Sequence, residues 1–142
     1  MAYWLLKSEP GNWSWDDQKK KGAEGEPWTG VRNHLAKKHM MSMKLGDQCF
    51  FYHSVDEKRV VGIVEVSAEA HPDHTDPDGK WFCVDVVAIA DMPRPVTLDD
   101  CKKEPVLKDM VLVNNSRLSV QPVTDEEWRT VCRMGNYEAP GK

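Results

Sequence analysis

The stretch QCFFYHSVDEKRVVGIVEVSAEA, residues 48–70, contains two β-rich segments separated by the charged tripeptide Asp56-Glu57-Lys58. The first segment, QCFFYHSV, is rich in aromatic residues, which favour extended structure. The second, RVVGIVEVSAEA, alternates apolar and polar side chains after Gly62, as a strand does when one face is buried. Because the break between them is short and polar, the stretch predicts a β-hairpin at the centre of the fold.

A third extended segment follows this hairpin. The polar stretch HPDHTDPDG, residues 71–79, predicts a loop, and KWFCVDVVAIADM, residues 80–92, predicts a long strand that ends at Pro93 and Pro95. Parallel neighbours need a crossover of about a dozen residues or more, so three strands joined by short connections cannot form an all-parallel sheet. The centre of the chain therefore predicts a curled sheet that contains antiparallel pairs.

Shorter elements flank this sheet. We expect a strand from residue 2 to a loop at Lys7-Ser8-Glu9, helices at 14–21, 31–43, 98–103 and 125–134, and a short strand at 118–121. The 31–43 helix should bury one apolar face made of Leu35, Met40 and Met43. The other three helices begin at a Ser or Thr that is followed three residues later by an acid, which is a helix-start pattern. The order of elements predicts an α+β fold, with helices packed outside a curled mixed sheet or open barrel.

Length and composition restrict the class of protein. The chain has 142 residues, of which 40% are hydrophobic and 30% charged, as expected for one globular domain spanning residues 1–142. Its four cysteines form no CxxC pair, and no apolar run approaches the roughly 20 residues of a membrane span. The N-terminus has no basic region followed by an apolar run. These features predict a reduced, cytoplasmic protein without a membrane partner.

Charge is distributed unevenly along the chain. The net charge is -4, yet the stretch WTGVRNHLAKKHMMSMK, residues 28–44, contains four Lys or Arg side chains and no acid. An aromatic ring beside clustered cations is the composition of a surface that stacks a base and contacts phosphates. Trp28 is the candidate ring because it lies in a Gly- and Pro-rich loop just before the basic residues. Simple packing of Trp28 in the core is the open alternative.

Other motifs favour structural roles. His53 and Ser54 are adjacent, but no GxSxG elbow accompanies them, so nucleophilic catalysis is not indicated. The His- and Asp-rich loop 71–79 lacks the EF-hand and HExxH spacings, and the cysteines lack zinc-site spacing, so no metal is expected. The chain also lacks the GxxxxGK[ST] and GxGxxG phosphate-binding motifs, which argues against a nucleotide cofactor.

Six stretches agree in wording, order and spacing with one known family. They are YWLLKSEP, WTGVRN, MKLGDQCFFYHS, GIVEVSAEAHPD, KWFCVDV and, near the C-terminus, LSVQP with TDEEW. Together they resemble the EVE domain over most of the chain, from Tyr3 to about Met134. The EVE domain belongs to the PUA-like superfamily and is a structural relative of the YTH domain. The resemblance thus implies a curled, mostly antiparallel sheet surrounded by helices, in agreement with the patterning.

The same resemblance implies a function. EVE proteins resemble readers of modified bases, with modified cytosine in DNA the usual proposal, and YTH relatives hold a methylated adenine of RNA in an aromatic cage. The chain is therefore expected to be a non-catalytic module that binds nucleic acid through a flipped, modified base, without cofactor or metal. It is expected to be a monomer that works beside enzymes acting on modified nucleic acid.

Carried onto this sequence, the resemblance implies two sets of residues. The base pocket is expected at Lys7, Ser8, Glu9, Trp28, Thr29, Arg32, Asn33, Tyr52, His53, Ser54 and Trp81, and phosphate contacts at Arg32, Lys37, Lys38 and Arg117. Ser116 and Ser119 are expected to approach the pocket from the C-terminal strand. A carboxylate such as Glu9 can accept from an exocyclic amine, and the amide of Asn33 both donates and accepts.

Alternatives to this reading stay open. The fold could serve a small-molecule or protein-binding module, or a hydrolase acting on modified nucleosides through Glu9 or His53. Eukaryotic nuclear members of the family carry a basic N-terminal extension, whereas this sequence begins at the first expected strand. The resemblance is therefore to the bacterial branch, and a cytoplasmic location is expected unless the chain is eukaryotic.

Overall fold

The computed structural model describes residues 2–115 and 117–138. Six strands form one mixed sheet: β1 (Tyr3–Ser8), β2 (Glu26–Pro27), β3 (Gln48–His53), β4 (Arg59–Pro72), β5 (Phe82–Thr97) and β6 (Val120–Val123). Their order across the sheet is β2-β5-β4-β3-β1-β6. The β1–β3 pair is parallel and the other pairs are antiparallel, so the predicted mixed sheet and the β3–β4 hairpin are confirmed. The sheet is open, because β2 and β6 stand at its two ends.

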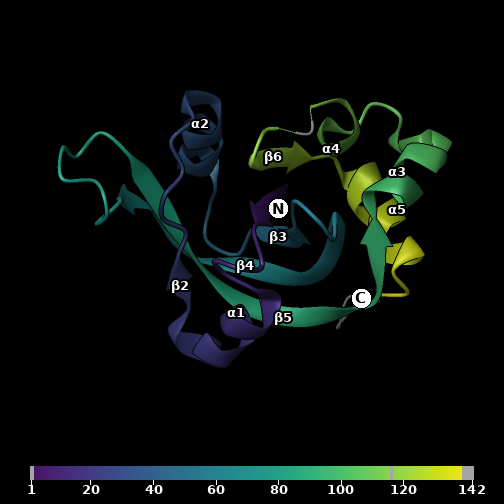
Figure 1. The fold of residues 1–142 in the computed structure, drawn as a ribbon, viewed down its shortest axis with the longest axis horizontal. Coiled ribbons are helices and arrows are strands. Elements are labelled where there is room, and N and C mark those ends of the chain that lie inside the picture. Colours follow the sequence, from purple (N-terminus) through teal and green to yellow (C-terminus); the bar gives the residue numbers. More distant parts are fainter. Residues whose placement is uncertain (1, 116, 139–142) are drawn as a thin grey trace.

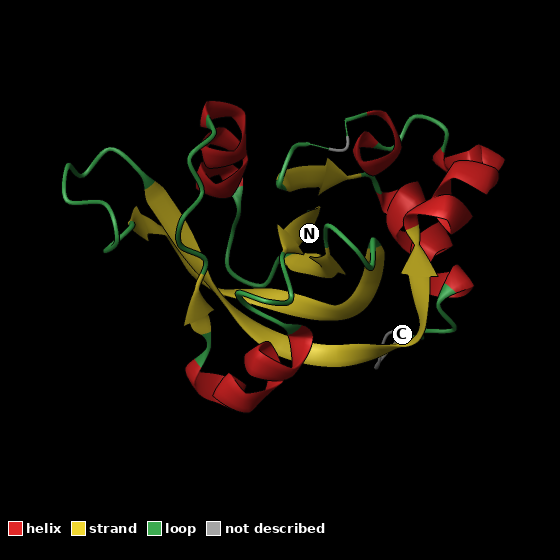
Figure 2. Cartoon of the chain, in the orientation of Figure 1, coloured by secondary structure: helices red, strands yellow, loops and turns green. Residues whose placement is uncertain are grey.

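Five α-helices surround the sheet: α1 (Trp15–Lys21), α2 (His34–Ser42), α3 (Leu98–Lys103), α4 (Val111–Asn114) and α5 (Asp125–Met134). Two 3-10 turns, η1 (Gly22–Glu24) and η2 (Pro105–Leu107), complete the described elements. Figure 1 shows α2 beside one end of the long β4–β5 pair, and α3, α4 and α5 gathered at the opposite end. Coloured by type, the helices all lie outside the curled strands (Figure 2). None of the helices in the described part of the chain is long and apolar enough to cross a bilayer.

Three helices begin where local sequence predicts. Ser14, Thr97 and Thr124 each accept from the backbone N–H three residues on, and the acid there bonds back to the cap backbone. Each capping box satisfies two backbone donors that a helix start would otherwise leave unpaired. The helices expected at 98–103 and 125–134 are therefore confirmed, and the one expected at 14–21 begins one residue later.

The sheet separates two hydrophobic clusters. Successive side chains of a strand point to opposite faces, so Phe51 packs in one cluster and its neighbours Phe50 and Tyr52 in the other. The first, the tryptophan cluster, contains Trp4, Trp15 and Trp28 and lies against α1 and α2. The second, the α5 cluster, contains Leu5, Trp128 and Val131 with residues of α3 and α4.

The predicted end of the third long strand is wrong. β5 continues past Pro93 and Pro95 to Thr97. Both prolines fall where the β4–β5 register shifts, between the pairs Gly62–Asp91 and Val60–Val96. A bulge tolerates proline because its residues do not donate to the ladder. Between the prolines, the Arg94 N–H donates to the Gly135 carbonyl at 2.9 Å, which ties the bulge to the end of α5.

Smaller departures concern the flanking elements. The helix expected at 31–43 begins at His34, and Leu35 is 46% exposed, whereas Ala36 and Met40 are buried. β4 runs on to Pro72, the short strand expected at 118–121 lies at 120–123, and β2 and α4 were not expected. A strand of two residues and a helix of four are too short to produce a periodic pattern in the sequence.

Candidate nucleic-acid interface

A cavity of about 440 Å³ opens beside Trp28, where the end of β1 meets the loop between β2 and α2. We call it the Trp28 cavity. Six of the expected base-pocket residues line it: Lys7, Ser8, Glu9, Trp28, Thr29 and Arg32. The lining also includes Ser119, which was expected to approach it, and Asn12, Trp13, Glu26, Pro27, Gly30 and Val31. The volume is within the range of ligand pockets, which begins near 300 Å³.

The turn after β1 forms one wall of the Trp28 cavity. The Glu9 carbonyl accepts from the backbone N–H groups of Asn12 and Trp13, both at 2.9 Å. The Ser8 hydroxyl donates to the Trp13 carbonyl at 2.5 Å, and the indole N–H of Trp13 donates to Gln18 at 2.9 Å. These bonds hold the turn in place, while the Glu9 side chain stays exposed. The turn thus presents a carboxylate and a half-buried indole ring to the cavity.

Trp28 forms the floor of the cavity. Its backbone N–H donates to the Val84 carbonyl at 2.7 Å, and its side chain is only 7% exposed. Its ring meets Phe51 edge to face, with centroids 5.5 Å apart and an interplanar angle of 88°. Trp28 packs in the tryptophan cluster, so the packing alternative is confirmed, and it also lines the cavity, where stacking on a base stays a prediction.

Asp73 holds the opposite rim. Its carboxylate, which is fully buried, accepts from the Gly30 N–H at 2.9 Å, from Arg32 at 3.1 Å and from Thr75. Burial acts to raise the pKa of Asp73, but hydrogen bonds from Thr75, Gly30 and Arg32 outweigh it and lower the pKa to about 2. Gly30 has a φ of +84°, a backbone conformation that residues with side chains rarely adopt, so this conformation favours glycine there.

Some of the cations expected to contact phosphate are bonded within the fold, and others have exposed side chains. Arg32 is committed to Asp73 and Thr75, so it is less available for phosphate than the sequence indicates. Lys37 donates to the Lys80 carbonyl at 2.7 Å, whereas Lys38 and Arg117 have exposed side chains. Burial lowers the pKa of Lys7, whose ammonium lies 5.6 Å from the Tyr52 ring centroid. Ser116 lies outside the described residues.

Asn33 and Trp81 do not line the Trp28 cavity. Asn33 caps α2, and its side-chain oxygen accepts from the Ala36 N–H at 2.9 Å, so the expected base contact is replaced by a helix cap. Trp81 lies on the far side of Arg32, with its ring centroid 4.9 Å from His34 and 5.8 Å from the Arg32 guanidinium carbon. It belongs to a neighbouring aromatic and cationic cluster instead of forming a second wall.

Three more expected residues are absent from the lining because of strand alternation and burial. Tyr52 packs in the α5 cluster on the opposite face of the sheet, where burial raises its pKa to about 12. His53 is buried, accepts from the Trp15 N–H at 3.0 Å through Nε2, and directs Nδ1 to Glu57 at 2.9 Å. The Ser54 N–H donates to the Ser8 carbonyl. His53 and Ser54 therefore support the base of the turn rather than the cavity.

The cysteines do not supply a nucleophile in this structure. All four are free and buried. Burial raises the pKa of the Cys83 thiol to about 11 and those of Cys101 and Cys132 to about 12. A thiol with such a pKa is protonated at neutral pH, and the thiol is a poor nucleophile compared with the thiolate.

Sequence reasoning missed Trp13 and the apolar part of the lining. Trp13 follows the Pro10-Gly11 break, a loop position that resembles that of Trp28 and was the available signal. Pro27 and Val31 have no chemistry that marks them in a sequence, and only their position beside Trp28 places them in the cavity.

A larger cavity of about 570 Å³ lies beside α5, and we call it the α5 cavity. Tyr3, Trp128, Arg129, Cys132, Arg133 and Tyr137 are among the residues that line it. The Trp128 ring already stacks on Tyr3 and on Phe50, with centroids 4.3 and 4.0 Å apart. The α5 cavity thus has greater volume, but its tryptophan uses its stacking surface within the core.

Comparison with known proteins places this architecture in a family. The family model for the EVE domain matches residues 2–134. The chain belongs to the EVE domain family. A solved protein from Agrobacterium tumefaciens has 57% sequence identity and a TM-score of 0.96, covering 100% of this chain and 98% of that one.

A human relative and a YTH domain extend the comparison. Human thymocyte nuclear protein 1 is 34% identical over 169 residues, covering 96% of this chain and 75% of the relative. The crystal structure of human THYN1 protein in complex with 5-methylcytosine-containing DNA has a TM-score of 0.89 and 33% identity, covering 98% of this chain and 100% of that one. A YTH domain from Zygosaccharomyces rouxii has the same fold at a TM-score of 0.59 and 20% identity, covering 97% of this chain and 88% of that one.

Proposed function

We propose that this EVE domain binds nucleic acid without catalysis and holds a modified base, foremost 5-methylcytosine, in the Trp28 cavity. The observation that carries the proposal is the meeting of two tryptophans, a carboxylate and an apolar wall around one cavity of about 440 Å³. The human relative that was crystallised with 5-methylcytosine-containing DNA supports modified cytosine as the first base to test.

Each part of the lining matches a part of a methylated cytosine. Trp13 and Trp28 offer aromatic surface, and stacking of a base on an aromatic ring contributes about 1–3 kcal/mol. Pro27 and Val31 offer an apolar wall to a methyl group, which is worth roughly 1–3 kcal/mol. Glu9 carries an exposed carboxylate that can accept from the exocyclic amine of cytosine.

Glu9 also provides a way to distinguish bases of the same shape. Thymine has the methyl group of 5-methylcytosine but a carbonyl oxygen in place of the amine. A carboxylate facing that oxygen would leave two acceptors opposed, so thymine should bind more weakly. A hydrogen bond to a charged group contributes about 1.5–3 kcal/mol, which corresponds to a preference of at least about tenfold.

The test is fluorescence anisotropy with matched short oligonucleotides. Cytosine, 5-methylcytosine, 5-hydroxymethylcytosine, thymine and N6-methyladenine are compared at one position, in DNA and in RNA, at two salt concentrations. We expect tightest binding to a modified cytosine, and a drop of about tenfold in its preference over thymine in Glu9→Gln. Glu138→Gln, at an exposed acid that lines the α5 cavity, is the matched control and should bind as the wild type does.

Other outcomes separate the competing functions. Failure to bind every oligonucleotide would favour a small-molecule or protein ligand for the Trp28 cavity. A hydrolase would instead release product from a modified nucleoside at low protein concentration, and mass spectrometry after long incubation would detect it. His53 is disfavoured as its base because both ring nitrogens are engaged within the fold. A hydrolase that uses Glu9 would lose turnover in Glu9→Gln by far more than the roughly tenfold change expected for base preference.

Lys38 and Arg117 are proposed as phosphate contacts because both side chains are exposed and neither forms an ion pair within the described residues. Lys37 and Arg32, which are already bonded to Lys80 and Asp73, are proposed as weaker contacts. Phosphate contacts make binding weaken as salt rises, with a log–log slope of about -0.7 per contact on a single strand. A monomeric state, a cytoplasmic location and partner enzymes acting on modified nucleic acid stay predictions of the same proposal.

A further inference from the structure

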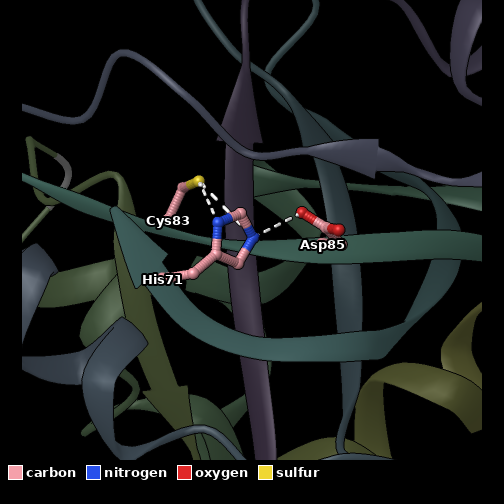
Figure 3. Close-up of side chains that lie close together, drawn as sticks. All are labelled: His71, Cys83 and Asp85. Atoms are coloured by element: carbon pink, nitrogen blue, oxygen red, sulfur yellow. Dashed lines mark hydrogen bonds and ion pairs between the residues drawn. The ribbon is translucent and has the colours of Figure 1, made fainter. Parts of the chain in front are cut away.

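Three side chains with metal-binding atoms meet on the paired strands β4 and β5. His71 and Cys83 are directly opposite each other in the strand register, and Asp85 lies two residues beyond Cys83, on the same face. The His71 Nε2 is 2.8 Å from the Asp85 carboxylate, and the Cys83 sulfur is 3.8 and 3.9 Å from the two ring nitrogens. Figure 3 shows the imidazole between the thiol and the carboxylate.

The three donors are close enough to share one ion. Their ligand atoms all lie within 4.8 Å of one another, and no other such group is found in residues 2–115 and 117–138. Tetrahedral zinc, with bonds of about 2.0–2.3 Å, places its ligand atoms roughly 3.4–3.6 Å apart. The observed separations of 2.8 Å between nitrogen and oxygen and 3.9 Å between nitrogen and sulfur lie on either side of that value. Small side-chain rotations would therefore accommodate the ion.

A second contact fixes the orientation that a metal-binding imidazole needs. The His71 Nδ1 lies 3.3 Å from the carbonyl oxygen of Pro72. Histidines that bind metal through one nitrogen commonly donate the other N–H to a backbone carbonyl or a carboxylate. With an ion on Nε2, the imidazole proton would reside on Nδ1 and point to Pro72, so the neighbour required for that tautomer is already in place.

We propose that His71, Cys83 and Asp85 form a binding site for a zinc-class divalent cation. A thiolate and a carboxylate balance the charge of the ion, and the neutral imidazole completes a three-residue donor set of the kind that zinc accepts. Binding releases the Cys83 thiol proton to solvent, and the imidazole binds as the tautomer that carries its proton on Nδ1. The side chains of His71 and Asp85 are 38% and 32% exposed, which gives the ion a route in and leaves a coordination position for water.

The ion would lie close to Asp73, the residue that holds the rim of the Trp28 cavity. Asp73, two residues after His71, holds Gly30 and Arg32 at the Trp28 cavity, and its backbone N–H donates to the Trp81 carbonyl. An ion bound by residues 71, 83 and 85 would cross-link β4 to β5 just before Asp73 and so stabilise the rim. The site itself is independent of the proposed base reading, and its test needs no nucleic acid.

The experiment titrates reduced, chelator-treated full-length protein with Co²⁺ and follows the absorption spectrum. We expect a thiolate-to-cobalt charge-transfer band at one equivalent, visible d–d bands of tetrahedral intensity, and loss of both on addition of Zn²⁺. Cys83→Ser should abolish the charge-transfer band, and Asp85→Asn and His71→Gln should each weaken binding by roughly 100-fold or more. Cys132→Ser, at another buried cysteine, is the matched control and should keep the wild-type spectrum.

Several results would overturn the site. The proposal is wrong if the wild type develops no charge-transfer band, if the band persists in Cys83→Ser, or if Asp85→Asn binds Co²⁺ as tightly as the wild type. Cys83 is fully buried, so its serine variant could fold poorly. In that event the half-exposed positions decide: His71→Gln and Asp85→Asn should fold and still lose the Zn²⁺-induced rise in melting temperature that the wild type shows.

Discussion

The Trp28 cavity and the α5 cavity differ in a way that volume does not capture. The α5 cavity is larger, about 570 Å³ against about 440 Å³ for the Trp28 cavity, and each contains a tryptophan and basic side chains. Trp128 stacks nearly parallel on Tyr3 and Phe50, at interplanar angles of 15° and 17°. The rings of Trp28 and Phe51 are perpendicular, at 88°, and within the described residues this is the one aromatic contact of Trp28.

We infer that a tryptophan stabilises the fold at the α5 cavity and, in the proposed function, stacks on a base at the Trp28 cavity. A ring that stacks within the core stabilises the fold through its faces. No aromatic ring of the described residues stacks in parallel on Trp28. The turn at Glu9 and the rim at Asp73 then place polar groups around Trp28, whereas Trp128 lies on the inner face of α5. Four predictions test this division.

The largest effect is expected for Trp128→Ala. Removing a buried ring that stacks on two others should lower the free energy of unfolding by about 3–5 kcal/mol. Urea denaturation measures the loss, with Trp128→Phe as a milder control that keeps one ring. Oligonucleotide binding of the folded fraction should be unchanged. If binding falls while circular dichroism shows folded protein, the assignment of recognition to the Trp28 cavity alone is wrong.

The next comparison uses the two glycines that support the clusters. A Cβ on Gly62 would lie 2.3 Å from the Trp15 ring, which is held by its indole bond to Asp91 at 2.7 Å. A Cβ on Gly135 would lie 2.1 Å from the sulfur of Met92, whose side chain is flexible, and 3.1 Å from the Arg94 carbonyl oxygen. We expect Gly62→Ala to cost about 3 kcal/mol and Gly135→Ala about 1 kcal/mol.

Thermal and urea unfolding of both glycine variants provide the measurement. Because a rigid indole cannot move aside as a thioether can, the order of the two losses is the decisive result. Equal losses, or a larger loss for Gly135→Ala, would show that the tryptophan cluster is as adaptable as the α5 cluster.

The third prediction concerns acid. The folded pKa of Asp73 is about 2, below its usual value of about 3.9, so its carboxylate stabilises the fold above about pH 4 and that contribution is lost as pH falls toward 2. The loss should be about 2 kcal/mol and should appear first at the cavity rim, where Asp73 holds Gly30. Backbone NMR follows the amide of Gly30, with the indole N–H of Trp128 as the internal control.

Asp73→Asn provides the matched variant for the acid titration. It keeps the shape of the side chain but removes the charge that titrates, so its stability should change less between pH 4 and pH 2. An unchanged Gly30 amide signal in the wild type across this range would contradict the role of Asp73 at the rim.

The smallest effect is expected from exposed cations. Lys38→Ala, on α2, should weaken oligonucleotide binding a few-fold and reduce the log–log salt slope by about 0.7 for single strands. Arg133→Ala, beside the α5 cavity, removes an equal charge from the other region and should leave both quantities unchanged. Anisotropy titrations at several salt concentrations compare the two variants. Equal salt slopes would contradict the proposed phosphate contact on α2.

Much of the fold is readable from local sequence. The residues Ser14, Thr97 and Thr124 indicate helix starts because a capping box needs only four neighbouring residues. The β3–β4 hairpin is likewise readable from alternation and a short polar break. The strand was predicted to end at Pro93 because proline ends a regular ladder. Proline is tolerated in a bulge, and a bulge depends on pairing with the partner strand, which local sequence does not show.

The candidate site was only partly readable in the same way. The expected turn Lys7-Ser8-Glu9 and the segment around Trp28 lie together at one cavity. Tyr52 and His53 are neighbours in sequence, and both were expected in the pocket. Strand alternation places Tyr52 in the α5 cluster, and the buried His53 bonds to Trp15 and Glu57. Sequence spacing places residues along the chain, and it does not say which of them a cavity exposes.

By itself the sequence determined the α+β class, the central hairpin, the helix starts and the family, because periodicity, capping and motif order are properties of neighbouring residues. The tertiary structure alone shows that Trp28 is perpendicular to Phe51, that Asp73 bonds to Gly30 and Arg32, and that His71 lies beside Cys83 and Asp85. Those contacts join segments far apart in the chain. They depend on the register of β4 against β5 and on how the loops pack beside it, which no local pattern records.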